Sequence, residues 1–551
     1  MCGEQSPLGK PIRQGKLCGR PSVLSLLAMV LMLISLGSGC ATGFKEYVSN
    51  GFKVGPNYLK PAAPVSSNWI DYHDGRVQTH PPLSAAWWRV FNDPTLDSLV
   101  QTAHSQNLSL RDAGFRVMEA RAQRAIAVGG LFPQFQEVYG SYQRRQLSLE
   151  TAGFPGGAGG GGFPGIERNF DIWTLGGQMA WELDFWGRFR RAIEAADAEL
   201  DASVEDYDDV LVILIGDVAA AYVEIRTVEQ RLEYARSNVS YQTGSLDLAK
   251  TKQAEGVSSR LDVAQAVTNV AQTEATIPQL EIQLRQAQNR LCVLMGMPPQ
   301  DLTPLLATER GIPRAPMQVA LGIPADLIRR RPDVRREERQ VAAQSARIGI
   351  AETELYPAFT ITGNIFVQAD QFSDMFRSSA VGGNVGPAFN WNILNYNRIR
   401  NSIVVEEARF MQQVTQYQNA VLEANREAED AVVTFLRAQN EARILREGVD
   451  AAVESRDLIN ELYKGGRADF GRVFFAEFFL VQQQDALAQA EGRIALGLVN
   501  IYRALGGGWE IRLEPLPPMT VVPPVGPPPE AIPVPVPLPD VQPVAPPQAG
   551  S

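Results

Sequence analysis

The sequence predicts an α+β membrane protein in which a long α-helical barrel is joined to a transmembrane β-barrel, the two assembled from a trimer with four strands per protomer. Three observations support this prediction. Two long stretches without proline have heptad periodicity, four shorter stretches alternate apolar and polar residues, and the whole arrangement occurs twice in the chain. The chain therefore has an internal two-fold sequence repeat.

The first long helix is expected over residues 188–253. Apolar residues recur there every seven positions, and a second apolar row accompanies them, interrupted only by Gln242. No proline lies between Pro164 and Pro278, so nothing forces a break. About 65 helical residues make a rod of roughly 100 Å. The first row is Leu211, Val218, Ile225, Leu232, Val239 and Leu246, and the second is Leu214, Ala221, Val228, Ala235 and Ala249.

The second long helix is expected over residues 398–464, where the same two rows recur with smaller side chains, such as Ala428 and Ala431. Two similar helices are expected to pack along these rows. A plain coiled-coil spacer is an alternative explanation for such rods.

Composition excludes several classes of function. A net charge of −10 argues against a nucleic-acid partner. The three histidines, His73, His80 and His104, have no metal-ligand spacing, and no nucleophile and base stand in a catalytic pattern. We therefore expect neither an enzyme nor a bound cofactor or metal.

Residues 1–39 are interpreted as a secretory signal peptide. Four basic residues, Lys10, Arg13, Lys16 and Arg20, precede an apolar run over 23–36 that is short for a membrane span. Small residues then lead to Cys40.

The segment Leu36-Gly37-Ser38-Gly39-Cys40 resembles a bacterial lipobox, which implies N-acyl and S-diacylglycerol lipid on Cys40. Gly37 stands where leucine is preferred, and ordinary cleavage that leaves Cys40 unmodified is the alternative. Ala41, in place of the aspartate typical of inner-membrane retention, favours the outer membrane. Of the other cysteines, Cys2 and Cys18 leave with the signal peptide and Cys292 has no partner, so no disulfide is possible within one mature chain.

The first repeat is expected over 87–299, after a lipidated, extended N-terminal linker over 40–86. It begins with helices and continues with a strand pair at about 133–147 and 172–184. The long helix and a return helix over 257–295 complete it. A glycine run between the strands contains G-x-G-x-x-G over 157–162, but no helix follows it, so a dinucleotide site is not expected.

The second repeat is expected over 323–509, after a linker over 300–322. Its strand pair is placed at about 358–368 and 384–393, its long helix at 398–464 and its return helix at 467–505. Residues 510–551, mostly proline, valine and alanine, are expected to form a disordered tail.

The predicted strands are apolar on one face and polar on the other, with Trp181 and Trp391 near one end. This pattern suits a membrane barrel with lipid outside and water inside. Four strands cannot close a barrel, and membrane strands cannot leave an edge unpaired. Three copies would supply twelve strands, three times four. A half-buried soluble sheet is the alternative.

Several motifs together resemble the outer-membrane factor family, the TolC and OprM type exit ducts of tripartite efflux pumps. The resemblance extends from Cys40 to Trp509. It implies a homotrimer in the outer membrane with a long periplasmic extension, a periplasmic adaptor (membrane fusion protein) and an inner-membrane transporter of the resistance-nodulation-division type. The motifs are Val54-Gly55-Pro56-Asn57-Tyr58, Trp87-Trp88 with Phe91 and Asp93-Pro94, Arg330-Arg331-Pro332-Asp333-Val334-Arg335, Tyr463 with Gly466, and Tyr502-Arg503-Ala504-Leu505-Gly506-Gly507-Gly508-Trp509.

The resemblance also implies the function: a passive, gated conduit that carries small molecules such as drugs and toxic compounds from the inner-membrane transporter to the outside. A duct for polypeptide secretion shares the architecture and is an alternative. A periplasmic coiled-coil lipoprotein without a pore is another, although it has no need of amphipathic strands.

In this family the turns of the helical hairpins form the periplasmic end of the channel, and carboxylates just after each turn narrow the closed pore. The resemblance implies that Gly256 and Gly466 are the turns and that Asp262 holds one carboxylate position. The second repeat departs from the pattern, because Arg472 and Phe475 stand where relatives often place aspartate.

This departure leaves the nature of the gate open. Three copies of Phe475 could form an apolar constriction, or Arg472 could pair with Asp469 or Asp262. Alternatively, all four are surface residues of a helical hairpin.

Overall fold

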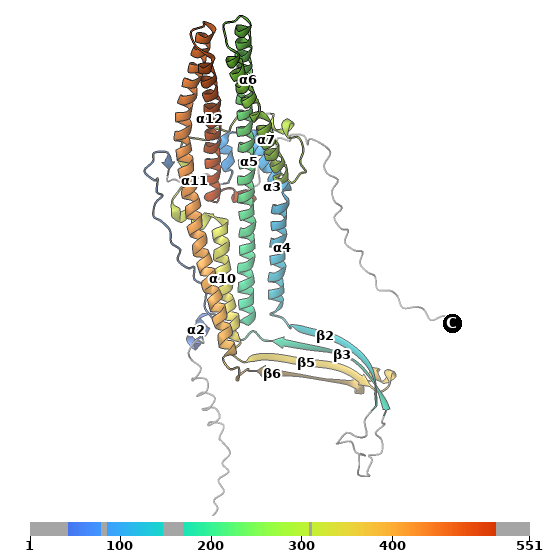
Figure 1. The fold of residues 1–551 in the computed structure, drawn as a ribbon. Coiled ribbons are helices and arrows are strands. Elements are labelled where there is room, and N and C mark those ends of the chain that lie inside the picture. Colours follow the sequence, from blue (N-terminus) through green and yellow to red (C-terminus); the bar gives the residue numbers. More distant parts are fainter. Residues whose placement is uncertain (1–41, 79–84, 147–168, 308–310, 514–551) are drawn as a thin grey trace, which may run out of the picture. The chain divides into compact units, whose positions relative to one another are not determined.

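The computed structural model describes residues 42–78, 85–146, 169–307 and 311–513 (Figure 1). The predicted signal peptide, Cys40 and the tail from residue 514 lie outside the described residues. The chain divides into two compact units, which we term the sheet unit and the hairpin unit. The sheet unit comprises Met1–Pro61, Ala120–Leu200 and Arg339–Thr415, and the hairpin unit comprises Ala62–Glu119, Asp201–Glu338 and Gln416–Ser551.

The sheet unit is built on a four-stranded antiparallel sheet with the order β2-β3-β5-β6 (Figure 1). Each repeat supplies two neighbouring strands, and β3 pairs with β5 where the repeats meet. Within this sheet β2 and β6 are the edges. The strands are β2 (Phe135–Gln146), β3 (Asn169–Glu182), β5 (Ala358–Ala369) and β6 (Val381–Asn390).

The register of the sheet keeps apolar residues on one face and polar residues on the other. Where the repeats meet, Trp181 pairs with Ile361, whereas Gln178 pairs with Asn364 on the opposite face. Because side chains alternate along a strand, a shift of one residue would exchange the two faces. The predicted alternation is therefore present in the folded sheet.

The last strand ends earlier than predicted. β6 ends at Asn390 instead of residue 393, because Trp391 turns away from the ladder and its indole nitrogen donates a hydrogen bond to the carbonyl oxygen of Leu355 at 2.9 Å. In the first repeat Trp181 donates equivalently to the carbonyl of Leu131 at 3.1 Å. The two tryptophans thus hold the turn that precedes each strand pair.

Four helices contribute residues to both units, and their lengths show the duplication. α4 and α10 each have 22 residues, and α5 and α11 each have 67. At about 1.5 Å per residue, each of the longer two is about 100 Å long. Their bounds are α4 (Leu108–Gly129), α5 (Arg188–Ala254), α10 (Pro332–Thr353) and α11 (Arg398–Lys464).

The hairpin unit contains the return helices and several short elements. Among the described residues, no helix is both long enough and apolar enough to cross a bilayer. The longer helices are α3 (Pro94–Gln106), α6 (Arg260–Glu274), α7 (Thr276–Leu294) and α12 (Phe470–Ala504). The short elements are α8 (Thr303–Leu306), α9 (Leu327–Arg330), β1 (Val77–Gln78), β4 (Val319–Ala320) and the 3-10 helices η1 (Trp87–Phe91), η2 (Pro324–Asp326) and η5 (Trp509–Arg512).

The return helix of the first repeat differs from the prediction. Instead of one helix over 257–295, the chain forms α6 and α7, separated at Ala275. Pro278 causes the division, because it has no N–H to donate to the carbonyl of Glu274, and its ring crowds that carbonyl. The second repeat has Ala488 at the equivalent place, and α12 is continuous.

The predicted linkers contain structure that their composition did not indicate. The linker over 40–86 holds α2 (Phe44–Ser49) and β1, and the linker over 300–322 holds α8 and β4. The two strands pair in parallel, with Val77 opposite Val319. Short elements therefore occur within both predicted linkers. The sheet unit also includes η3 (Phe372–Phe376) and η4 (Ser378–Ala380).

The heptad rows are mostly buried, and residues of both rows, such as Val218 and Phe435, share the main core of the hairpin unit, but towards the hairpin ends the partners differ from the expectation. Val228, Leu232 and Ala235 of α5 cluster with Leu280 of α7. In the second repeat, Ala442 of α11 clusters with Leu487 and Ala490 of α12. In these stretches each long helix packs against its own return helix, and the expected pairing of the two long helices is wrong there.

The Trp87-Trp88 motif anchors the beginning of the first repeat in the core of the hairpin unit. Both indoles are buried, and Trp87 stacks on Tyr502 with ring centroids 5.2 Å apart. Asp93 caps α3 by accepting hydrogen bonds from the amides of Thr95 and Leu96. The other carboxylate oxygen of Asp93 accepts a hydrogen bond from the Tyr222 hydroxyl at 2.6 Å. The motif thus links α3, α5 and α12.

The Val54-Gly55-Pro56 motif fixes the N-terminal segment of the sheet unit. The guanidinium of Arg191 donates hydrogen bonds to the carbonyls of Val54 and Gly55 at 3.0 and 2.8 Å. Gly55 has a φ of +85°, and a Cβ built on it would lie 2.3 Å from the Cα of Gly349 in α10. A glycine is therefore required at this position for both its backbone conformation and its close approach.

Replacing Gly55 by alanine should destabilise the packing of the N-terminal segment by about 2 kcal/mol or more, because the new methyl group meets backbone atoms that cannot yield. Limited proteolysis of the G55A protein should cut within the segment before the helices are cut. G43A is a matched control, because a Cβ at Gly43 meets nothing within 4 Å. Equal protection of G55A and the unchanged protein would contradict this prediction.

Candidate functional site at the ends of the helical hairpins

Each hairpin of the hairpin unit turns through a glycine in the left-handed conformation. Gly256 has a φ of +74° and Gly466 a φ of +71°. After α5, the amide of Val257 donates to the carbonyl of Lys252 at 2.9 Å; after α11, the amide of Arg467 donates to the carbonyl of Leu462 at 2.8 Å. These are Schellman-type helix ends, in which glycine satisfies the last carbonyls without strain.

The helix that follows the first turn is capped by two side chains that bind each other's backbone. Ser259 is the N-cap of α6, and its hydroxyl accepts a hydrogen bond from the amide of Asp262. The carboxylate of Asp262 in turn accepts hydrogen bonds from the amide of Ser259 at 3.3 Å and from the Ser258 hydroxyl at 2.5 Å. This is a capping box, so Asp262 stabilises the hairpin itself.

The same hydrogen bonds set the ionisation of Asp262. Its partial burial acts to raise the pKa, but the hydrogen bonds from Ser258 and Ser259 outweigh burial and leave the pKa below its ordinary value. Asp262 therefore stays ionised at neutral pH, and a negative charge stands at the positive end of α6.

In the second hairpin the N-cap residue is an aspartate instead of a serine. Asp469 is the N-cap of α12 and accepts a hydrogen bond from the amide of Arg472 at 3.2 Å. The guanidinium of Arg472 lies 3.7 Å from the Asp469 carboxylate, and both side chains are mostly exposed. Of the two pairings considered for Arg472, the structure contains the one with Asp469. An exposed pair of this kind contributes little to stability.

A small core joins the ends of the two hairpins. Lys252 of α5 donates a hydrogen bond to the carbonyl of Tyr463, and its ammonium lies 4.3 Å from the centroid of the Tyr463 ring. Apolar side chains beneath this contact come from all four helices. They are Leu246 and Ala249 of α5, Ala266 of α6, Ile459 of α11, and Phe470 and Val473 of α12.

A polar layer lies below this core and is centred on Glu477 of α12. Glu477 is only 3% exposed, and its carboxylate accepts hydrogen bonds from the Ser245 hydroxyl at 2.5 Å and the Asn269 amide at 2.8 Å. Burial raises the pKa of Glu477 above its ordinary value, and the two hydrogen bonds together with the positive charge of Arg456 oppose this only in part. The ionised form of this buried carboxylate therefore lowers the stability of the folded hairpins.

Gln242, which interrupts the heptad row, is also buried. Within the described part of the chain, neither its amide nitrogen nor its oxygen has a hydrogen-bond partner. One helical turn away, Asn238 donates to Gln484 of α12 at 2.7 Å. Near the hairpin ends, polar side chains therefore replace the apolar contacts of the seam.

Phe475 belongs to an aromatic row on α12. It is 59% exposed and lies edge to face with Phe474, with centroids 5.6 Å apart. Phe474 in turn stacks on Phe478, and Phe479, also exposed, meets Phe478 edge to face. Sequence reasoning selected only Phe475, although the segment Phe474-Phe475-Ala476-Glu477-Phe478-Phe479 contained the signal.

Five of the six predicted positions of the hairpin ends form two local groups. Gly256 and Asp262 belong to the first turn and cap; Gly466, Asp469 and Arg472 belong to the second. Phe475 follows Arg472 by about one turn of α12 and is exposed. The predicted lipidation site, Cys40, lies outside the described residues.

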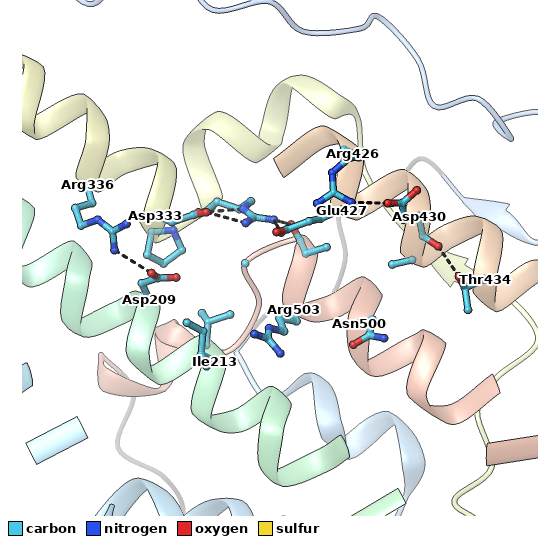
Figure 2. A pocket seen from close by; sticks show the side chains of 16 residues that line it. Asp209, Ile213, Asp333, Arg336, Arg426, Glu427, Asp430, Thr434, Asn500 and Arg503 are labelled. Carbon is cyan, nitrogen blue, oxygen red and sulfur yellow. Dashed lines mark hydrogen bonds and ion pairs between the residues drawn. The ribbon is translucent and has the colours of Figure 1, made fainter. Parts of the chain in front are cut away.

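A second polar feature of the hairpin unit is a cavity of about 480 Å³ between α5, α10, α11 and α12 (Figure 2). Its charged side chains are paired: Arg336 with Asp209 at 3.0 Å and Arg426 with Asp430 at 2.7 Å, as Figure 2 shows. Burial, followed by the neighbouring Asp333, raises the pKa of Asp209 to about 6.

The Arg330-to-Arg335 motif has its main anchor beside this cavity. Arg331 is buried and binds Asp333 at 2.7 Å, Glu427 at 2.8 Å and the carbonyl of Ala504 at 3.0 Å. Gly506 follows with a φ of +71°, and a Cβ there would lie 2.9 Å from the Cα of Arg331. The arginine motif and the glycine-rich end of α12 are thus two halves of one structural contact.

The side chains at the hairpin ends and around the cavity pack against one another or form ion pairs and hydrogen bonds. In the described ranges, no group of three or more histidine, cysteine, aspartate or glutamate side chains could hold a metal ion. The carboxylates near the hairpin ends cap helices or accept hydrogen bonds from neighbours. The contacts of Lys252 with Tyr463 and of Glu477 with Ser245 and Asn269 hold the two hairpins together.

The family model described as "Outer membrane efflux protein" matches residues 99–297 and 323–507, which fall within the two repeats. The chain belongs to this family. Nodulation protein T of Rhizobium leguminosarum bv. trifolii is 30% identical over 478 residues, covering 85% of this chain and 97% of the relative. The pyoverdine export outer membrane protein OpmQ of Pseudomonas aeruginosa is 29% identical over 77% of this chain and 87% of its own length.

Solved structures agree with the family assignment. The outer-membrane channel OprN superposes with a TM-score of 0.75 at 31% identity, covering 83% of this chain and 99% of that chain. The protein is therefore an outer-membrane exit channel of the efflux class, located in the bacterial outer membrane with a periplasmic extension.

Replacing Glu477 by glutamine should stabilise the hairpin ends at neutral pH by about 1 kcal/mol, because the buried charge disappears while its shape remains. The raised pKa means that the folded protein holds this proton more strongly than the unfolded chain. Protonated Glu477 therefore adds to the free energy of unfolding at low pH, and this contribution is lost as the pH rises through the raised pKa. Hydrogen exchange of α6 and α12 should show the advantage of E477Q at pH 7.5 and its decline as the pH approaches 4.

E255Q is the matched control, because Glu255 is exposed near the first turn. It should leave exchange unchanged at both pH values. A difference between E477Q and the unchanged protein that is independent of pH would show that the substitution acts through packing alone.

Proposed function

We propose that this chain forms a trimeric, gated and passive duct that carries small molecules through the outer membrane as the exit component of a tripartite efflux pump. Energy enters at an inner-membrane transporter of the resistance-nodulation-division type, and a periplasmic adaptor joins the transporter to the duct. The chain itself performs no chemistry. Relatives named for pyoverdine export and toluene efflux support small molecules as the cargo.

One observation carries this proposal: the sheet has one apolar face and two unpaired edges. Val138 of β2 and Val385 of β6 are both exposed on the apolar face. In a bilayer every backbone polar group needs a partner, so β2 and β6 must pair with other copies. Three copies of four strands would close a twelve-stranded barrel with a polar interior.

The ends of the hairpins are the proposed gate. The aromatic row around Phe475 supports an apolar constriction, since Phe475 and Phe479 are exposed in the single chain. Asp262 and Asp469 are engaged as helix caps and Arg472 pairs with Asp469, so these charges would line the entrance without blocking it. Separating the hairpins would open the duct.

Conductance of the purified protein in planar bilayers, with its oligomer mass measured in parallel, tests the duct directly. A trimer with small channels that rarely open is the expected result. A monomer or dimer without conductance would overturn the proposal and favour a periplasmic spacer. Conduction of polypeptide but of no small molecule would favour a secretion duct.

Phe475→Ala should widen the closed gate, because three large rings are removed from the constriction at once. We expect a several-fold rise in single-channel conductance and in the uptake of large antibiotics by cells. Leu261→Ala is the matched control, since Leu261 is an exposed apolar residue near the turn of the other hairpin. Equal behaviour of the two variants would place the constriction elsewhere.

Lipidation of Cys40 is a further part of the proposal, supported by the lipobox-like segment before it. Cys40→Ser should abolish the incorporation of radiolabelled palmitate. Each acyl methylene group contributes about 0.8 kcal/mol of membrane binding, but the barrel could still insert. Cys18→Ser, within the signal peptide, should be labelled normally, and equal labelling of both variants would contradict lipidation at Cys40.

A further inference from the structure

The two repeats meet within the sheet unit through a specific contact. The segment from Leu183 to Gly187, between β3 and α5, packs on the turn that precedes β5 in the second repeat. Trp186 stacks on Tyr356 with ring centroids 4.6 Å apart, and its indole nitrogen donates to the carbonyl of Pro357 at 2.8 Å. This contact brings the first repeat onto the second.

The duplication supplies a second copy of each half of this contact. Ile393 to Asn397, between β6 and α11, corresponds to Leu183 to Gly187, and both segments end in a residue with positive φ, +63° at Asn397 and +86° at Gly187. The turn Leu131–Phe132–Pro133 before β2 corresponds to Leu355–Tyr356–Pro357, since the two strand-end tryptophans bind the carbonyls of Leu131 and Leu355 alike.

The second copies of the segment and of the turn both carry an exposed aromatic side chain. Tyr396, the counterpart of Trp186, is 92% exposed, and Phe132, the counterpart of Tyr356, is 64% exposed. They stand at the outer strands β6 and β2, at opposite sides of the sheet, so one chain cannot bring them together. Tyr396 also has a φ of +49°, which its half-buried counterpart Trp186 lacks and which a side chain of this size rarely adopts.

An apolar groove lies beside Tyr396. It has a volume of about 420 Å³ and is lined by the start of α11 and by the turn before β5. Its apolar lining residues are Leu355, Ile393, Leu394, Ile403 and Val404.

The helices α10 and α4 of the two repeats also differ in how much of their surface is buried within one chain. α10 is packed on both sides: Ala343 clusters with Ala198 of α5, and Ile348 clusters with Ile399 of α11. Its counterpart α4 has no buried residue over 120–129. Exposed apolar side chains occur there and on α11, including Ile126 and Val404. α4 therefore lacks, in one chain, the second neighbour that α10 has.

We infer that the groove beside Tyr396 receives the Leu131–Phe132–Pro133 turn of a second copy of this chain, with Tyr396 stacked on Phe132 as Trp186 is stacked on Tyr356 within each chain. The inference rests on the proposed function and specifies the interface of that assembly. Each copy then offers two different surfaces, and such head-to-tail contacts form a ring when the rotation between neighbouring copies closes, as the proposed twelve-stranded barrel requires.

The strands constrain the same interface. The apolar face uses odd-numbered residues of β6, such as Val385, and even-numbered residues of β2, such as Val138. For the apolar faces to be continuous across the junction, odd residues of β6 must lie opposite even residues of β2 from the next copy. The ladder and the groove can form together, because the segment 393–397 follows β6 directly.

The test places one cysteine in each half of the interface, as Tyr396→Cys with Phe132→Cys in one chain. Both residues are exposed, so the variant should fold, and the native Cys292 is buried. A short bifunctional thiol reagent applied to membranes should convert the monomer band on a denaturing gel into dimers and closed trimers and into nothing larger. Either single variant should stay monomeric on the gel.

Trp186→Cys with Tyr356→Cys is the matched control, since it places the same chemistry in the equivalent contact within one chain. It should link internally and leave the chain mass unchanged. A trimer of the first double variant that conducts but shows no link between neighbouring chains, while the control pair links, would overturn the inference and leave the duct intact. A monomer without conductance would overturn the proposed function itself.

A second measurement does not depend on cross-linking. Phe132→Arg should lower the temperature at which the trimer dissociates in detergent, because a charge enters the apolar groove. Phe376→Arg is the control, since Phe376 is also highly exposed but lies outside the groove. Equal dissociation temperatures for the two variants would contradict the assigned contact.

Discussion

Among the described residues, β2 and β6 at the edges of the sheet have no partner strand on their outer sides, and the proposed assembly depends on this constraint. β2 and β6 each present a row of N–H and C=O groups, and the neighbouring apolar face favours lipid over water. In a bilayer such groups cannot be left to solvent. In the proposed trimer the remaining hydrogen bonds of these edges would lie between copies, and the pairing of β3 with β5 is an example of such a junction within one chain.

Duplication does not make the two hairpins alike. Both turn at a glycine with nearly the same φ, yet one uses a serine cap with an aspartate at the third position and the other an aspartate cap with an arginine. The phenylalanine row occurs only on α12, where α6 has smaller or polar residues such as Ala264 and Thr268. Two turns of nearly the same backbone geometry thus present different side chains to their surroundings.

Periodicity and proline placement predicted the long elements well. α5 and α11 begin at Arg188 and Arg398 as expected, because heptad rows and the absence of proline are local properties. Which helix packs on each row could not be predicted, because the periodicity shows only that one face of the helix is buried. The division at Ala275 could have been foreseen from Pro278. Helix α2 depends on packing near Tyr47, which composition does not reveal.

Less of the site than of the fold could be predicted from the sequence. The family pattern predicts Asp262 as a carboxylate after the first turn and Asp469 only as a partner of Arg472, whereas the spacing of Ser259 and Asp262 is itself typical of a capping box. The burial of Glu477 needed the structure, because its partners Ser245 and Asn269 come from two other helices.

Pro278 has a mechanical consequence. A helix with a missing backbone hydrogen bond bends at lower cost than an uninterrupted one, so the α6 arm has a joint at Ala275, whereas the α12 arm behaves as a stiff lever. A force applied at the hairpin ends would therefore be transmitted unequally by the two return arms: the arm of α6 and α7 would bend at Ala275, whereas α12 would transmit the displacement along its whole length.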